Sequence, residues 1–250
     1  MESDRKQMIQ DLRALGVREG GVLMVHSSLR SLGPVAGGAE TVIEALLGAL
    51  GPRGTLLLPA LSYENVHAGN PHFDVRQTPS CVGALAEYFR QRAATRRSIH
   101  PTHSVSGVGA LADEILSGHE NDHTPCGPNS PWHRLPHYDG QILFLGCGMR
   151  PNTSMHAVEE LSEPLYLFKN PVTYEITDAV GRVFPMTVRR HAFDDWEHFY
   201  DRVAGLLDDD ALHTGKVLAA DCQLIESPEM WQAASAKLEA APLYFVERLN

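Results

Sequence analysis

Two short apolar runs on either side of a helix-forming segment constrain the fold of this chain most strongly. Val22-Leu23-Met24-Val25 and Thr55-Leu56-Leu57-Leu58 are each typical of a strand buried on both faces. Residues 39–50 between them predict a helix, and Gly51-Pro52-Arg53-Gly54 predicts a turn. Such a strand–helix–strand unit favours an α/β protein with a largely parallel sheet.

The remaining elements extend this architecture without an internal repeat. The sequence predicts helices near residues 3–15, 82–91, 152–160, 196–207 and 228–238, a buried strand at 142–147, a loop and strand at 98–109, and a hairpin of strands 172–177 and 182–188. We therefore expect one domain over residues 1–250. It has a central sheet, largely parallel or mixed, flanked by helices, with a small C-terminal subdomain of a β-hairpin and helices.

Charge and composition narrow the classes of partner. The net charge of -10 argues against nucleic acid and favours a cationic small molecule. No run approaches the roughly 18 apolar residues of a membrane helix, and the N-terminus is polar, so we expect a soluble cytoplasmic protein that does not bind membranes. The four cysteines lie far apart and predict free thiols. Either a monomer or a homodimer is compatible with the sequence.

Three polar clusters are predicted to follow strands, where α/β sheets bind ligands. They are His26-Ser27-Ser28, the segment from His100 to Ser104, and the segment around His156. The loop at 60–80 has no periodicity, which is typical of a functional loop, and its Tyr63, Glu64 and other aromatic and polar residues suit a substrate rim.

His156 and Glu159 are the strongest catalytic candidates. They follow the apolar run at 142–147 and lie three residues apart, so on a helix their side chains meet. A histidine oriented by a carboxylate is suited to act as a general base. The alternative is that His156 packs locally while Glu159 is solvated, as most helical ion pairs are structural.

Gly37-Gly38 precedes the predicted helix at 39–50. The free N–H groups and dipole of a helix start suit a phosphate, with Ser27 and Ser28 as hydroxyl donors and Arg30 as a cation. Read alone, the paired glycines are more typical of a simple turn.

Two other chemistries are disfavoured. Cys147 follows a strand close to His156, but its neighbours predict burial, and a buried cysteine is usually inert. His100 and His103 flank a proline, and His119 and His123 lack an evident third ligand, so we expect no metal site.

Taken together and in order, these segments resemble the aminoglycoside 3-N-acetyltransferase family, also called the antibiotic N-acetyltransferase family. The resemblance spans roughly residues 5–240. The matching segments are Val25 to Gly33, Gly37-Gly38, Gly51-Pro52-x-Gly54-Thr55-Leu56-x-x-Pro59, Phe73-Asp74, Thr78-Pro79-Ser80-x-x-Gly83, His100-Pro101-x-His103-Ser104-Val105, Gly127-x-x-Ser130-Pro131 and Asn152-Thr153-Ser154-x-His156-x-x-Glu159.

The resemblance implies acetyl transfer from acetyl-CoA to an amine, most simply the 3-amine of an aminoglycoside. His156, oriented by Glu159, would take the proton as the amine attacks the thioester directly. The coenzyme would lie along three groups of residues: His26, Ser27, Ser28, Leu29 and Arg30; Gly37 and Gly38; and His103, Ser104 and Val105.

The acceptor is less constrained. A polyamine needs carboxylates, so we expect the substrate site to contain Tyr63 with Glu64, Asp74, Glu160 and Glu163. The loop at 60–80 is compact, which leaves a different amine metabolite as an alternative acceptor. A thioesterase or amidohydrolase in which His156 activates water, and a non-catalytic CoA-binding protein, remain as alternatives of other classes.

Overall fold

The computed structural model describes residues 2–193 and 195–249. Its helices are α1 (Glu2–Leu15), α2 (Ala39–Leu50), α3 (Ala84–Arg92), α4 (Ala112–Leu116), α5 (Pro131–Arg134), α6 (Ser154–Ser162) and α7 (Ser227–Ala240), with 3-10 segments η1 (Leu29–Leu32), η2 (His119–Asn121), η3 (Leu135–Tyr138) and η4 (Tyr200–Leu206). Its strands are β1 (Val22–Ser27), β2 (Thr55–Pro59), β3 (His72–Asp74), β4 (Arg96–Arg97), β5 (Val105–Gly109), β6 (Gln141–Leu145), β7 (Val172–Thr177), β8 (Val183–Val188), β9 (Trp196–His198), β10 (Leu212–Val217), β11 (Ala220–Glu226) and β12 (Val246–Arg248).

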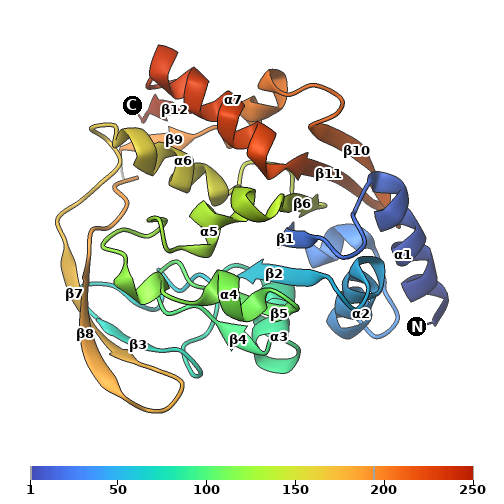
Figure 1. Cartoon of the computed structure of the whole chain (residues 1–250), viewed down its shortest axis with the longest axis horizontal. Helices are drawn as coiled ribbons and strands as arrows, with labels where there is room; N and C mark the ends of the chain where they lie inside the picture. The colour runs from blue at the N-terminus through green and yellow to red at the C-terminus, as the bar shows by residue number, and fades with distance from the viewer. Residues whose placement is uncertain (1, 194, 250) are drawn as a thin grey trace.

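A seven-stranded sheet in the order β10-β11-β6-β1-β2-β5-β4 forms the centre of the molecule (Figure 1). Only the three central strands run parallel, with β1 between β6 and β2, and the neighbours on both sides are antiparallel. The prediction of an α/β fold with a largely parallel or mixed sheet is therefore confirmed, in its mixed form.

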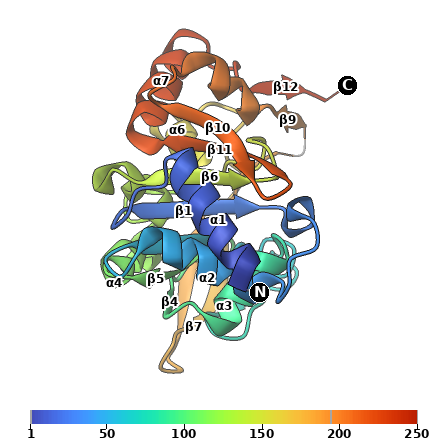
Figure 2. The same cartoon turned by 90° about the vertical axis from the view of Figure 1, so that its right-hand side faces the viewer.

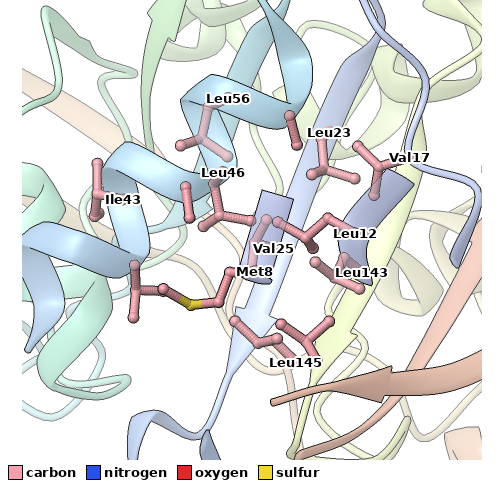
Figure 3. Packing of buried hydrophobic residues seen from close by; sticks show 14 of the residues in the cluster. Met8, Leu12, Val17, Leu23, Val25, Ile43, Leu46, Leu56, Leu143 and Leu145 are labelled. Carbon is pink, nitrogen blue, oxygen red and sulfur yellow. The ribbon is translucent and has the colours of Figure 1, made fainter. Parts of the chain in front are cut away.

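The central strands are buried on both faces because their side chains alternate between two cores. Leu23 and Val25 face the core beneath α1 and α2, where Met8 and Leu46 meet them (Figure 3). Met24 faces the other core, which contains residues of α6 and α7. Figure 2 shows α1 and α2 lying across one face of the sheet.

Two smaller sheets surround the central one. The predicted hairpin is present as β7 and β8, and Figure 1 shows it at the edge of the molecule opposite α1. Residues 60–80 were expected to lack regular structure, but β3 pairs in parallel with β7 and places Phe73 in the hairpin's own core. In the C-terminal part, β9 pairs with β12.

Two parts of the C-terminal third differ from the sequence-based prediction. The expected helix at 196–207 is a strand, β9, followed by the 3-10 segment η4, because residues 196–198 alternate between half-buried and exposed positions and pair with β12. The hairpin of β10 and β11 was not predicted, yet it extends the central sheet next to β6. Among the described helices, none is long and apolar enough to cross a bilayer.

Candidate active site

A cavity of about 420 Å³ opens where β1 and β2 end. This volume lies in the range of small-molecule sites. The end of β1 contributes His26 and Ser27, and α6 contributes His156. Arg190, His191, Phe193 and Tyr200 also line the cavity, the last three in contact with His156. The segment from His100 to Ser104 connects the short strand β4 to the antiparallel β5, and the pairing of Val105 with Pro59 places it at the same edge of the sheet.

The structure brings His156 and Glu159 together on α6. The imidazole borders the cavity, while the Glu159 side chain is fully buried behind it. Their direct separation, Nδ1 to Oε2, is 3.4 Å. The hydroxyl of Tyr200 closes this gap: it donates to Glu159 Oε2 at 2.7 Å and lies 2.7 Å from His156 Nδ1. The pair predicted from the sequence is therefore joined mainly through a third residue.

Glu159 is held as a carboxylate by its hydrogen bonds. Burial acts to raise its pKa, but hydrogen bonds from His156, Tyr166 and Tyr200 and the charge of His156 outweigh burial, and the pKa is lowered below its ordinary value. Tyr166 donates to Oε1 at 2.7 Å. Burial, followed by the proximity of Glu159, raises the pKa of both tyrosines, so each stays a donor.

An aromatic and imidazole shell surrounds His156. Phe193 stacks on its ring at 4.8 Å, and the rings of His191 and His198 lie at 4.7 Å and 6.0 Å. Burial lowers the pKa of His198 to about 4 and that of His191 well below 6.5, and repulsion from His156 adds to both shifts. The base therefore lies among neutral rings.

The sequence reasoning missed the residues of this shell: Tyr166, His191, Phe193, His198 and Tyr200. The one signal for most of them was the density of histidines and aromatic residues between positions 191 and 200. Residues 196–207 were read as a helix and residues 189–195 were assigned to no element, so none of these side chains was assigned to the site.

The residues expected to bind the coenzyme fall into three groups. His26, Ser27 and His103 line the cavity. Ser28, Leu29 and Arg30 continue from β1 into η1 and are not among the described residues that line the cavity. Gly37 and Gly38 immediately precede α2. At Gly38, with φ of 58°, a side chain would meet no atom within 4 Å, so the helix start is open.

Ser104 and Val105 do not face the cavity. Both are fully buried, and Ser104 Oγ donates to the Ala60 carbonyl and accepts from Arg97 Nε, both at 2.8 Å. The correction follows from strand pairing: Val105 begins β5, so its side chain packs in the core. Of the predicted trio, His103 alone reaches the cavity.

The expected substrate residues are also divided. Tyr63 lines the cavity, and Glu64 is exposed beside it. Asp74 instead accepts from the N–H groups of Arg76 and Gln77 in a turn, and Glu163 pairs with Arg189 at the surface. The structure does not bring Asp74 or Glu163 to the cavity.

Glu160 is buried behind His191. Its Oε1 lies 2.8 Å from His191 Nε2 and accepts from the N–H of Cys126. Burial raises the pKa of Glu160 to about 8 despite hydrogen bonds from Thr124 and Cys126. Burial favours the neutral form of both partners, so the contact is a hydrogen bond rather than an ion pair.

Cys147 lines the cavity and is half-buried, not enclosed as expected. Burial nevertheless raises the pKa of its thiol to about 12. A thiol that stays protonated is a poor nucleophile. Cysteine catalysis is therefore disfavoured because of the raised pKa of the thiol and not because the side chain is enclosed.

The fold and site together define an α/β protein with a buried His–Tyr–Glu relay at the wall of a small-molecule cavity. The sequence model of the family described as aminoglycoside 3-N-acetyltransferase matches residues 24–239, and the chain belongs to that family. The resemblance inferred from the sequence is therefore confirmed.

Individual relatives support this assignment. Aminoglycoside N(3)-acetyltransferase III of Salmonella sp is 37% identical over 188 residues, which cover 69% of this chain and 65% of the relative. Aminoglycoside N(3)-acetyltransferase IX of Micromonospora chalcea is 33% identical, covering 68% and 66%. The chain thus aligns with slightly less than two thirds of the Salmonella protein.

Solved structures agree on the fold. AAC-IIIb in a binary complex with CoASH superposes with a TM-score of 0.82 at 26% identity, covering 94% of this chain and 96% of that protein. A histidine-to-alanine variant of aminoglycoside acetyltransferase AAC(3)-IVa in complex with a gentamicin superposes at 0.80 and 29% identity, covering 96% and 90%.

Proposed function

We propose that this protein transfers an acetyl group from acetyl-CoA to an amine of an aminoglycoside, at the 3-amino position, in the cytoplasm. The observation that carries the proposal is the link from His156 Nδ1 through the Tyr200 hydroxyl to Glu159 at a cavity wall. Family membership supplies the reaction class, and the CoASH complex of a structural neighbour supports the donor. The free cysteines fit a reducing compartment.

The relay assigns a role to each nitrogen of His156. Because Tyr200 donates its proton to Glu159, its oxygen accepts the Nδ1 proton of the imidazole. Nε2 then carries the lone pair and takes the proton from the substrate amine as its nitrogen attacks the thioester carbonyl. The C–S bond breaks, CoA leaves as the thiolate, and the imidazolium returns the proton to the sulfur. The charge of Glu159 stabilises the imidazolium that forms, as in hydrolase triads. A general base of this kind contributes about 10²–10⁴-fold in rate.

The coenzyme is expected to approach along the end of β1. His26 and His103 border the cavity, and burial, with repulsion from His156, lowers the pKa of His26 to about 3. The Nε2 atom of His26 is buried without a hydrogen-bond partner among the described residues. We assign Ser27, Ser28 and Arg30 to the phosphate end, next to the open start of α2.

The cavity wall favours a second class of acceptor. None of its described lining residues is Asp or Glu, whereas Arg190 lines it, together with Arg150, which is paired with Glu197 at 2.7 Å. A polycationic sugar favours carboxylates, so a smaller amine that carries an anionic group is the alternative acceptor for the same acetyl transfer.

The test is release of CoA thiol from acetyl-CoA, with and without aminoglycosides, including pairs that differ only at the 3-amine. We expect release that requires an acceptor and is lost without the 3-amine. Release with amino acids or aminophosphonates alone would select the second class, and release without any amine would identify a thioesterase.

A further inference from the structure

Three imidazoles meet at one end of the cavity. His103, His156 and His191 come from three separate segments, and one ring nitrogen of each lies within 4.8 Å of the other two. The ring planes cross at 77°, 81° and 49°, so the rings converge on a shared space rather than stack.

In each ring one nitrogen is held from outside the cluster. His103 Nδ1 bonds Thr102 Oγ1 at 2.8 Å, and His156 Nδ1 bonds the Tyr200 hydroxyl at 2.7 Å. This leaves Nε2 of both rings for the cavity side.

His191 follows the same pattern with its nitrogens exchanged. Its Nε2 bonds Glu160 Oε1 at 2.8 Å, while its Nδ1 is buried with no hydrogen-bond partner among the described residues. A buried ring nitrogen without a partner is costly unless a ligand satisfies it.

We propose that these three histidines bind one divalent transition-metal ion of the Zn²⁺ class, with a fourth position open to the cavity. Three imidazoles with one open position form a common zinc site, with Zn–N distances of about 2.0–2.1 Å. Such bonds place tetrahedral ligand nitrogens about 3.4 Å apart, so the rings need to approach by at most about 1.4 Å. Mg²⁺ and Ca²⁺ prefer oxygen ligands and do not fit.

The surroundings match what metal-bound histidines require. Ligating imidazoles almost always donate their second N–H to a carboxylate or another acceptor, which fixes the ring. Here the buried Glu160 holds His191 directly, and the buried Glu159 holds His156 through Tyr200. A bound dication favours the ionised form of both carboxyl groups, and their charges then balance that of the ion.

The neighbouring His119 has no free ring nitrogen for an ion. Both nitrogens of His119 are engaged, by Ser98 Oγ at 3.0 Å and the Pro125 carbonyl at 3.1 Å. A second group of potential ligand atoms joins Cys126, Glu160 and His191, but neither Cys126 nor Glu160 lines the cavity. The three-histidine cluster thus has ring nitrogens that converge and lines a cavity through which an ion can reach them.

The metal and the general base use the same lone pair. When Nε2 of His156 is bound to an ion, it does not accept a proton, so the metal-bound form does not catalyse acetyl transfer. This consequence rests on the proposed function, whereas the binding site does not.

Calorimetric titration of the chelator-treated full chain with Zn²⁺ tests the site. We expect one ion per chain, and a Kd at least about tenfold weaker in His103→Ala and His191→Ala. His67→Ala, at the exposed cavity mouth, is the matched control and should bind like the parent chain. Co²⁺ bound in place of Zn²⁺ should give the visible bands of a tetrahedral complex, which weaken in the same variants.

No saturable binding, or unchanged binding in both histidine variants, would overturn the proposal. Circular dichroism confirms that the variants are folded, and His191→Gln provides a second, larger side chain at that position. In the thiol-release assay, Zn²⁺ should inhibit and chelator should restore the rate. A parent chain that binds the ion with no change in rate would exclude His156 as a ligand.

Discussion

Tyr200 is the residue on which the geometry of the base depends. It is buried, its ring lies 5.2 Å from that of His156, and its hydroxyl contacts both the base and its carboxylate. Without it the direct contact of 3.4 Å between His156 and Glu159 is too long for a strong hydrogen bond. Tyr200 is thus a positioning residue, acting through His156.

Replacing Tyr200 by Phe should lower kcat about tenfold or more, because the imidazole loses its preferred orientation and tautomer. KM for acetyl-CoA should remain close to that of the parent chain. Tyr166→Phe is the control: it removes a donor to Glu159 that does not touch His156, so kcat should fall less. Steady-state kinetics of both variants measure the difference, and equal losses of kcat would contradict the positioning role.

The sequence predicted His156 and Glu159 because neighbours three residues apart meet on any helix. It did not predict Tyr200, which is 41 residues from Glu159 in the chain. Contacts of that kind depend on how β9 and η4 return to α6, and no local spacing encodes that return. Ser104 and Val105 were expected along the coenzyme from the family resemblance, and their burial follows from the pairing of β5 with β2, which the local sequence does not encode.

At the scale of elements, the loop after β6 and the loop after β1 support each other at Gly146. Ser31 Oγ donates to the Gly146 carbonyl at 2.8 Å and lies 2.9 Å from Ser28 Oγ. Gly146 has φ of 72°, and a side chain there would lie 2.6 Å from Ser31 Cβ. The position of the loop after β1, which we assign to the coenzyme, therefore depends on a contact that only glycine permits at position 146.

Gly146→Ala should destabilise the fold by about 1–3 kcal/mol, since both overpacking and a positive φ oppose the new methyl group. It should also raise KM for acetyl-CoA as the loop after β1 shifts. Gly205→Ala, where no atom lies within 4 Å, is the matched control. Urea unfolding measures the difference, and equal stability of the two variants would show that the loop adapts freely.

In the central sheet, the strands that form continuous apolar runs were predicted, whereas the mixed strands β10 and β11 were not. Strands β1, β2 and β6 consist of residues that are almost all buried, so each forms an apolar run that is evident in the sequence. By contrast, β11 alternates largely between buried and less buried positions, and β10 carries polar residues because it is an edge strand. Edge position is a property of the assembled sheet, so the local sequence does not reveal it.

At the scale of the whole molecule, buried imidazoles make stability depend on pH. Burial lowers the pKa of seven histidines: to about 3 at His26 and His119, to about 4 at His198, well below 6.5 at His100, His103 and His191, and below 6.5 at His133. The unfolded chain takes up protons on these rings below pH 6.5 while the folded chain does not. The contribution of these histidines to the free energy of unfolding is therefore fully present above pH 6.5 and is lost as the pH falls toward 3.

The melting temperature should decrease steadily from pH 7 to pH 4.5. Glu160 and Asp122 have the opposite effect, because burial raises the pKa of each, to about 8 at Glu160. Each carboxyl group stabilises the fold below its unfolded pKa and loses that contribution as the pH rises, but two carboxyl groups oppose seven imidazoles. His119→Gln should make the slope shallower, and the exposed His67→Ala should not change it. Thermal unfolding over this range that shows no decrease would refute the neutral state of the rings.

The most direct test of His156 as the general base is the kcat of CoA thiol release by His156→Ala and by the parent chain, each with the best acceptor. The affinity of both proteins for acetyl-CoA is measured alongside. We expect kcat to fall about a hundredfold or more while acetyl-CoA still binds. An unchanged kcat would show that His156 is not the general base and that the relay through Tyr200 to Glu159 has only a structural role.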